Sequence, residues 1–283
     1  MSARNPDPRP ASTGTRKDPA ELESALAAGE LAGRLEGRRP AVFLDYDGTL
    51  TPIVARPELA VLSDEVRNVL EELASRVPVV IVSGRDRADV AGLVRIEDLV
   101  YAGSHGFDIT GPQGLQMEAE KAGAFLPAIE AAGEELDKRL ASVPGSQVER
   151  KRFAISVHYR NVAEEHVAQV ERIVDEVLPA HEGLEKRGGK MVFELRPTID
   201  WDKGKAVRWL LGALRLDGPE ILPIYVGDDL TDEDAFRELT GDGVGIVVGR
   251  PDRPTFAQFG LEDIGEVEQF LRQLSDRSSD EGR

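Results

Sequence analysis

Three short apolar runs in this chain each end in a polar cluster, and this repeated pattern constrains the fold more than any other sequence feature. The runs cover residues 41–44, 77–82 and 221–226, and they end in the letters DYDGT, SGR and GDD. Continuous apolar runs of this length are typical of parallel strands that are covered on both faces. Strand ends of an open parallel sheet carry its ligand-binding groups, so the three clusters predict one functional edge.

Segments with the length and spacing of helices separate the apolar runs. We predict helices over 64–75, 86–94, 203–216 and 232–239, and further strands over 99–102 and 244–248. Strands that alternate with helices of this length specify an α/β fold with a doubly wound parallel sheet. Leucines at near-helical spacing predict one more amphipathic helix over 21–36.

The middle of the chain interrupts this alternation and predicts a second unit. We expect a long helix over 118–142, a strand over 148–159, a helix over 164–178, and two strands over 184–196 that turn at Gly188-Gly189. This order is typical of a small α/β domain inserted into a core. The predicted division is a disordered tail at 1–20, a catalytic core at 21–107 and 198–275, an inserted cap domain at 108–197, and a disordered tail at 276–283.

The composition narrows the classes of partner and compartment. The formal charge of −17 argues against nucleic acid as the main partner, because binding a polyanion requires a basic surface. No apolar run approaches the length of a membrane span, and residues 1–19 lack the apolar core of a signal peptide. Cysteine is absent, which removes disulfides and cysteine-ligated zinc. We therefore predict a cytoplasmic enzyme with no nucleic acid or membrane partner.

The polar strand ends bring several carboxylates into one crevice. They are expected to meet there together with Ser83: Asp45, Asp47, Asp228 and Asp229. Such a cluster persists only if a cation lies among the charges, and oxygen ligands without histidine or cysteine favour Mg²⁺. An isolated Asp-x-Asp is usually a solvated turn or a helix cap, but the ordered set favours a catalytic edge.

The residue types at this edge suit phosphoryl transfer. Asp45 is placed to attack phosphorus, and Asp47, two residues on, to protonate the leaving group and later activate water. Ser83 is suited to donate a hydrogen bond to a phosphoryl oxygen. Lys203 begins a predicted helix and is the candidate to neutralise the transferring group.

Four segments, DYDGTLTP, VSGR, DKGKA and GDDLTDEDAF, resemble the four motifs of the haloacid dehalogenase superfamily, phosphatase branch, in the same order. The resemblance implies Asp45 as nucleophile, Asp47 as acid and base, and Ser83 and Lys203 as phosphoryl contacts. It also implies Mg²⁺ ligands from Asp45, Asp228 and the Asp47 carbonyl, with support from Asp229 or Asp232. The place of the insertion resembles the branch that carries a small α/β cap.

Substrate choice must come from the cap, because the core motifs define only the reaction. The segment 190–196 alternates, with Met191, Phe193 and Leu195 on one face and Lys190, Glu194 and Arg196 on the other. From alternation alone, the charged face is at least as well explained as the solvated side of a two-layer unit.

A further set of segments is similar to the trehalose-6-phosphate phosphatases: GSHG at 103–106, Glu149-Arg150-Lys151, His158-Tyr159-Arg160, GKMVFELRP and WDKGKAV. The similarity covers about residues 40–274. It implies a phosphoric monoester hydrolase of trehalose biosynthesis that acts through an aspartyl-phosphate. The residues implied to hold the disaccharide or close the cap over its phosphate are Glu149, Lys151, Arg160, Lys190 and Glu194, with Arg85 and His105 on core loops where they could meet the cap.

One detail of this assignment conflicts with a regular strand over 148–159. In such a strand Glu149 and Lys151 share a face and Arg160 has the opposite parity, so a bulge or strand end is required. A histidine in a turn, such as His105, is more often a structural hydrogen-bonding group than a catalytic one.

Two alternatives remain open from the sequence. A related phosphatase for sucrose phosphate or mannosylglycerate phosphate would share every core residue named above, and a non-catalytic sugar-phosphate sensor would not require Asp47. If the resemblance to the trehalose-6-phosphate phosphatases holds, the expected partner is a small sugar phosphate. Functional coupling to a trehalose-6-phosphate synthase is then expected as well.

Overall fold

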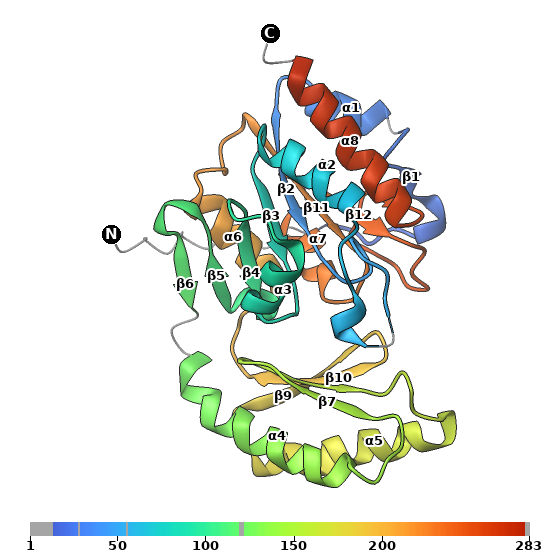
Figure 1. Ribbon diagram of the computed structural model, residues 1–283. Coiled ribbons are helices and arrows are strands. Elements are labelled where there is room, and N and C mark those ends of the chain that lie inside the picture. The colour runs from blue at the N-terminus through green and yellow to red at the C-terminus, as the bar shows by residue number, and fades with distance from the viewer. Residues whose placement is uncertain (1–13, 28, 55, 119–121, 281–283) are drawn as a thin grey trace.

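The computed structural model describes residues 14–27, 29–54, 56–118 and 122–280 of the 283-residue chain. These residues form a larger core and a smaller cap, which lies below the core in Figure 1. The core is an open sheet with helices on both faces, and the cap is a separate antiparallel sheet with helices on one face. This architecture confirms the predicted fold class.

The core sheet has nine strands in the described chain, in the order β1-β13-β12-β11-β2-β3-β4-β5-β6. Neighbouring strands are parallel from β1 to β4, whereas β5 and β6 add to the edge in antiparallel fashion. Their bounds are β1 Glu23–Ser24, β2 Arg39–Leu44, β3 Val79–Val82, β4 Val100–Gly103, β5 Asp108–Thr110, β6 Gln116–Glu118, β11 Ile221–Gly227, β12 Val244–Val248 and β13 Phe259–Leu261.

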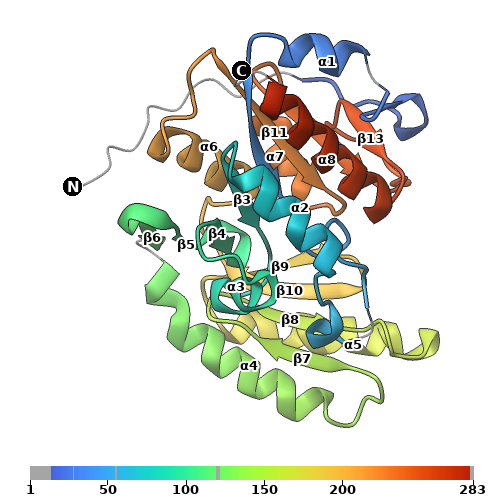
Figure 2. The same cartoon turned by 45° about the horizontal axis from the view of Figure 1, so that its top comes forward.

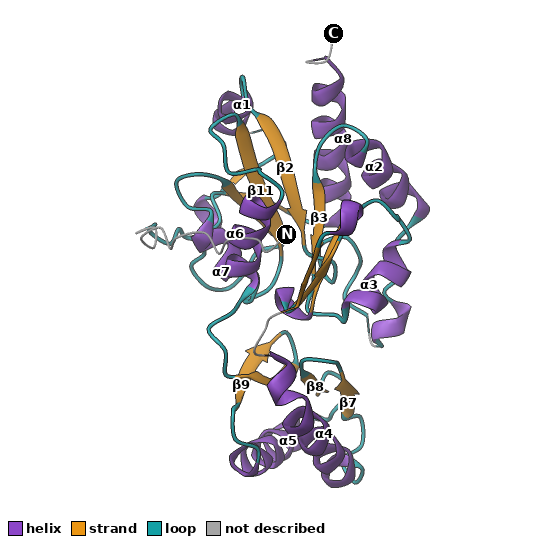
Figure 3. Cartoon of the chain, turned by 90° about the vertical axis from the view of Figure 1, so that its left-hand side faces the viewer, coloured by secondary structure: helices purple, strands orange, loops and turns teal. Residues whose placement is uncertain are grey.

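The two faces of the sheet are covered by different helices, as Figure 3 shows from the side. Val42 and Leu44 of β2 pack toward one face, and Ala41 and Phe43 toward the other, because successive side chains of a strand alternate. The first face is covered by α2 Asp64–Ala74, α3 Arg87–Val94 and α8 Ile264–Asp280, and the second by α6 Lys203–Ala213 and α7 Asp232–Glu238. The helix α1 Gly29–Leu35 adds Leu31 and Leu35 to the core on the first face.

The strand order reverses its direction at β2. From β2 the chain proceeds to β3 and β4 on one side, and after the cap it returns to β11 on the other side. A doubly wound sheet has its ligand crevice at this point, beyond the carboxyl ends of the strands. The cap lies against that end of the core (Figure 1).

The cap sheet has the order β7-β8-β10-β9 and is antiparallel throughout. Figure 2 shows the four strands side by side in this order. Helices α4 and α5 cover the side away from the core, where Val157 and Leu195 pack beneath them. The bounds are α4 Leu126–Leu140, β7 Gln147–Arg150, β8 Ile155–His158, α5 Glu164–Val177, β9 Leu184–Gly189 and β10 Val192–Pro197.

The cap hairpins differ from the predicted segments. The region read as one strand over 148–159 is the hairpin of β7 and β8, closed where the Lys151 amide donates to the Ala154 carbonyl at 2.9 Å. The predicted turn at Gly188-Gly189 lies two residues later, at Lys190 and Met191, because both glycines pair with β10. Lys190 is therefore a turn residue and not part of the alternating strand.

The edges of the core also differ from expectation. Residues 108–118 carry β5 and β6 of the core sheet, although they were predicted to begin the cap. The predicted helix over 21–36 forms only as α1, and residues 23–24 join the sheet edge as β1. Of the expected tail 1–20, residues 1–13 lie outside the described residues.

Part of each predicted tail belongs to the structured chain. Lys17 forms a bridge with Thr255, with backbone hydrogen bonds of 2.7 and 3.0 Å. At the other end, the helix α8 continues to Asp280, past the predicted boundary at residue 275. The apolar side of α8, with Leu271 and Leu274, packs this helix against the core.

Candidate active site

The predicted polar clusters meet at one edge of the core sheet. Asp45 follows β2, Ser83 follows β3, and Asp228 follows β11. The loop after β2 approaches Asp228 closely, since a Cβ atom on Gly48 would lie 2.2 Å from Asp228 Oδ2, and Gly48 has a φ of +87°. Only glycine meets both conditions without strain. Asp45 itself is placed beside the end of β11 by strand pairing, since its amide donates to the Val226 carbonyl at 2.9 Å.

Lys203 joins the nucleophile candidate to helix α7. Its Nζ donates to Asp45 Oδ1 at 2.7 Å and to Asp232 Oδ1 at 2.7 Å, and all three side chains are buried. Burial alone would lower the pKa of Lys203, but the charges of Asp232 and Asp45 outweigh it and raise the pKa. The ammonium group thus stays charged beside the position where a transferring phosphoryl group would lie.

Asp232 organises the loop that follows β11. Besides Lys203, it accepts hydrogen bonds from the Tyr225 hydroxyl at 2.7 Å and from the amides of Asp228 and Asp229 at 3.1 and 2.9 Å. The side chain is fully buried. It therefore fixes the direction in which Asp228 points into the crevice.

Three carboxylates at this edge are arranged as ligands for a cation. One oxygen from each of Asp45, Asp228 and Asp232 lies within 4.8 Å of the others. Burial, with the neighbouring Asp232, raises the pKa of Asp228 to about 6, and burial likewise raises the pKa of Asp45 well above its usual range. Asp228 Oδ1 is buried and has no hydrogen-bond partner among the described residues. An all-oxygen set with an unsatisfied acceptor fits Mg²⁺.

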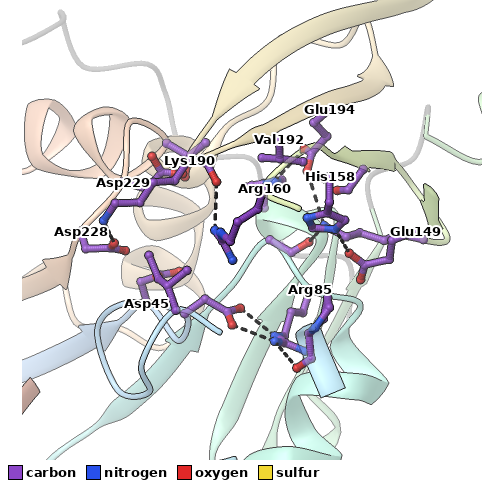
Figure 4. Close-up of a pocket in the computed structure, with 18 of the residues that line it drawn as sticks. Asp45, Arg85, Glu149, His158, Arg160, Lys190, Val192, Glu194, Asp228 and Asp229 are labelled. Atoms are coloured by element: carbon purple, nitrogen blue, oxygen red, sulfur yellow. Dashed lines mark hydrogen bonds and ion pairs between the residues drawn. The ribbon is translucent and has the colours of Figure 1, made fainter. Parts of the chain in front are cut away.

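Asp47 is held by Arg85 and does not lie in this cluster through its side chain. Arg85 donates from Nε to Asp47 Oδ2 at 2.6 Å and from Nη2 to Asp47 Oδ1 at 2.7 Å. The same guanidinium donates to Asp89 at 2.9 Å and to the Pro57 carbonyl at 2.8 Å. Although burial acts against the charged form, the bonds to Asp47 raise the pKa of Arg85. Figure 4 shows Arg85 at the core side of the pocket.

Ser83 lies buried at the end of β3. Its Oγ accepts a hydrogen bond from the Arg85 amide at 3.1 Å, and its carbonyl accepts from the His105 amide at 2.9 Å. A hydroxyl that accepts from an amide still carries its own proton to donate.

The cap sheet presents a polar face to the core. Because strand residues alternate, Glu149 of β7, His158 of β8 and Glu194 of β10 share this face, while their neighbours pack under the cap helices. Figure 4 shows Glu149, His158 and Glu194 on the same side of the pocket, opposite Asp45 and Arg85. The charged face is thus not simply solvated, as the alternative interpretation held.

Glu194 and Lys151 form a buried charged group at the cap–core boundary. Lys151 Nζ lies 3.5 Å from Glu194 Oε2 and donates to the Gly84 carbonyl of the core at 3.0 Å. Glu194 also accepts from the Ser156 hydroxyl at 3.2 Å and lies 2.8 Å from His105 Nε2, although this ring is not oriented for a good hydrogen bond. Burial opposes ionisation of Glu194, but His105 and Lys151 outweigh it and lower its pKa.

Two further side chains cross from the cap to the core. Lys190, in the turn between β9 and β10, donates to Asp228 Oδ2 at 2.7 Å. Arg160 donates to the Val54 carbonyl of the core at 2.6 Å and to the Lys190 carbonyl at 3.1 Å. The hairpin of β7 and β8 reverses the chain before Arg160, which removes the parity conflict with Glu149 and Lys151.

One pocket between core and cap collects nearly all of the predicted site residues. Those that line it are Asp45, Asp47, Arg85, Glu149, Lys151, Arg160, Lys190, Glu194, Lys203 and Asp228. Ser83 lies directly behind Arg85 and is not part of the lining. The lining also includes Ser156, which the sequence did not single out, and His158, which stood in the segment His158-Tyr159-Arg160 but received no site role. His105 and Asp229, which the sequence had singled out, line the pocket as well. No helix in the described part of the chain is long and apolar enough to cross a membrane.

Comparisons with known proteins agree with this geometry. The family model described as trehalose-phosphatase matches residues 43–263. Trehalose 6-phosphate phosphatase RA3 of Zea mays is 43% identical over 270 residues, which cover 90% of this chain and 75% of that protein. Probable trehalose-phosphate phosphatase 9 of Oryza sativa subsp. japonica is 45% identical over 276 residues, covering 89% and 74% of the respective chains.

Solved structures share the architecture. The crystal structure of a trehalose-6-phosphate phosphatase related protein aligns with a TM-score of 0.75 and 26% identity, over 85% of this chain and 99% of that chain. The C-terminal domain of C. albicans trehalose-6-phosphate phosphatase aligns with a TM-score of 0.76 over 90% and 99%, at 24% identity, and supports the fold alone.

Proposed function

This chain belongs to the trehalose-phosphatase family, and we propose that it hydrolyses trehalose 6-phosphate to trehalose and inorganic phosphate. The observation that carries the proposal is a pocket in which Asp45, Lys203 and Asp228 of the core face Glu149 and Glu194 of the cap. The core residues suit chemistry at phosphorus, and the cap carboxylates suit hydrogen bonds from sugar hydroxyls.

The proposed reaction has two steps. Asp45 attacks phosphorus and forms an acyl phosphate, while the bond from phosphorus to the sugar oxygen breaks and Asp47 donates a proton to that oxygen. In the second step Asp47 accepts a proton from water, which attacks phosphorus and releases phosphate from Asp45. Lys203 offsets the charge of the transferring group, and Ser83 donates a hydrogen bond to one of its oxygens.

We propose Mg²⁺ as the cofactor, held by Asp45, Asp228 and the Asp47 backbone carbonyl, with Asp232 as a neighbouring carboxylate. The support is the cluster of buried carboxylate oxygens and the unsatisfied Oδ1 of Asp228. When bound, a divalent cation there would offset the negative charge of phosphate and carboxylates.

The cap residues are proposed to bind the sugar or to close over it. Glu149, Lys151 and Glu194 line the pocket from the cap, which supports their proposed role in binding sugar hydroxyls. Lys190 and Arg160 reach core atoms directly, which supports a role in closure. Within the described residues, four of the five N–H groups of the Arg85 guanidinium donate to Asp47, Asp89 and the Pro57 carbonyl, so we propose that Arg85 acts mainly through Asp47. We also propose that the protein is cytoplasmic and that it is functionally coupled to the synthase that supplies trehalose 6-phosphate.

Phosphate release by the purified protein tests the proposal. With Mg²⁺ present, we expect the highest kcat/KM for trehalose 6-phosphate in a panel that includes sucrose phosphate and mannosylglycerate phosphate, and loss of release after chelation. Asp45→Asn should abolish turnover while its circular dichroism matches that of the wild type. Equal weak release from every ester would discard the sugar assignment, and release from none would favour a sugar-phosphate sensor.

A further inference from the structure

The central strand β8 of the cap supplies the side chain that orients a pocket carboxylate. His158 Nε2 lies 2.7 Å from Glu149 Oε2, and both side chains are about three-quarters buried. The pairing register opposes Glu149 to Ser156, so His158 is the diagonal neighbour of Glu149 on the same face. Since the acceptor is a carboxylate, the proton of this contact lies on Nε2 and His158 donates it.

The contact fixes Glu149 where a sugar would meet the cap. Burial opposes ionisation of Glu149, but the hydrogen bond from His158 and the charge of Lys151 lower its pKa. No hydrogen bond within the described part of the chain reaches the other carboxylate oxygen of Glu149, and both residues line the pocket. Figure 4 shows His158 and Glu149 joined side by side, away from Asp228 and Lys190.

His158 lines the pocket from the cap sheet, on the side opposite the core residues proposed to react at phosphorus. It makes its side-chain contact with the cap residue Glu149, whereas the residues around phosphorus come from the core and from α6. A donor that locks the rotamer of a binding group restricts which ligand geometry that group accepts. The effect of His158 should therefore fall on sugar recognition and not on phosphoryl transfer.

We propose that His158 is a positioning residue that sets sugar specificity by holding the Glu149 carboxylate in the orientation that accepts substrate hydroxyls. The inference rests on the proposed function, because it assigns Glu149 to the sugar. It adds His158 to the residues proposed for sugar recognition.

Two substitutions separate the hydrogen bond from the shape of the side chain. His158→Phe keeps a ring and removes the donor, whereas His158→Gln keeps an N–H donor. For His158→Phe we expect kcat/KM for trehalose 6-phosphate to fall about 10- to 100-fold, carried by KM, as for loss of a hydrogen bond to a charged group. For p-nitrophenyl phosphate, which has no sugar, the fall should be far smaller. His158→Gln should recover most of the lost selectivity.

The cap offers a matched control in the pair His181 and Glu135, where His181 Nε2 lies 3.1 Å from Glu135 Oε2 outside the pocket lining. His181→Phe removes the same type of contact from the same domain and should leave selectivity at the wild-type value. Inhibition of p-nitrophenyl phosphate hydrolysis by trehalose gives a second readout. Of the two phenylalanine variants, only His158→Phe is expected to show a larger inhibition constant for trehalose than the wild type.

The possible failures are distinguishable. If wild-type protein releases no phosphate from trehalose 6-phosphate, the proposed function is lost. If wild-type protein is selective and His158→Phe loses activity equally on both esters, or remains as selective as wild type, the positioning role of His158 is overturned. Failure of His158→Gln to restore selectivity would also contradict a role that depends on the donor.

Discussion

At the scale of single residues, Arg85 shows how a predicted substrate contact can also hold a catalytic group. The guanidinium is buried, and the four hydrogen bonds that it donates within the described residues go to Asp47, Asp89 and the Pro57 carbonyl. The Tyr46 ring lies beneath it, 5.5 Å from the guanidinium carbon to the ring centroid. A fixed bidentate donor of this kind sets the direction of the carboxylate that it binds. Each Asp47 oxygen retains a second lone pair for proton transfer.

Replacing Arg85 by lysine should impair the reaction in a way that depends on the leaving group. Arg85→Lys keeps a positive charge but cannot make both bonds to Asp47. We expect kcat to fall about 10- to 100-fold for trehalose 6-phosphate, whose alkoxide must be protonated, and less for p-nitrophenyl phosphate, whose phenolate leaves unaided. Steady-state kinetics with both esters measures the difference.

The neighbouring Arg87 provides the control for this substitution. It pairs with Asp108 at 2.9 Å and does not line the pocket, so Arg87→Lys should leave the ratio between the two esters unchanged. An equal loss on both esters in Arg85→Lys would show that Arg85 does not act through the acid and base.

At the scale of elements, helix α7 connects the sheet to the active edge. Its first residue, Asp232, accepts from Lys203, from Tyr225 of β11 and from two amides of the loop between β11 and α7. The side chain is completely buried, so its partners have no access to water as a replacement. Removing one member of such a group leaves the others buried and unpaired.

Asp232→Ala should therefore lower the free energy of unfolding by about 3 kcal/mol. Urea unfolding in the presence of a chelator measures this change without a contribution from bound metal. Asp234→Ala, in the same helix, removes only a partly exposed ion pair with Arg237 and should cost less than about 1 kcal/mol. Equal stability of the two variants would contradict the central role of Asp232 in this network.

At the scale of the whole molecule, the cap touches the proposed metal site directly. Lys190 in the cap turn donates to Asp228 Oδ2, which leaves only Oδ1 of this carboxylate unsatisfied. A cation on Asp228 and the ammonium of Lys190 repel each other and compete for the same carboxylate. Binding of a cation at Asp228 should therefore weaken the contact between Lys190 and Asp228, which joins the cap to the core.

Lys190→Met should consequently bind Mg²⁺ more tightly, by about 3- to 10-fold, since the Lys190 side chain is half exposed and its charge is partly screened. Calorimetric titration of the metal-free protein measures this affinity without reference to turnover. Lys186→Met removes a lysine that pairs with Glu171 and Asp175 on the cap and should bind as the wild type does. An unchanged or weaker affinity in Lys190→Met would exclude competition at Asp228.

Local sequence by itself determined the strands in which nearly every residue is buried. The runs around β2, β3 and β11 were predicted to within a few residues, because strands covered on both faces require apolar side chains without interruption. The polar letters after those runs likewise predicted that Asp45, Ser83 and Asp228 would meet, since parallel strands end at a common edge. The sequence also predicted that Lys203 would lie at this edge, because Lys203 begins a helix there.

Tertiary structure alone decided the contacts that join distant segments. The turn at Lys190 and Met191, the pairing of β5 and β6 with the core, and the hairpin of β7 and β8 depend on strand partners that local periodicity does not specify. The same holds for the bond from His158 to Glu149 and for the capture of Asp47 by Arg85. Periodicity reports which face of an element is buried, whereas the partner across that face depends on the packing of the entire chain.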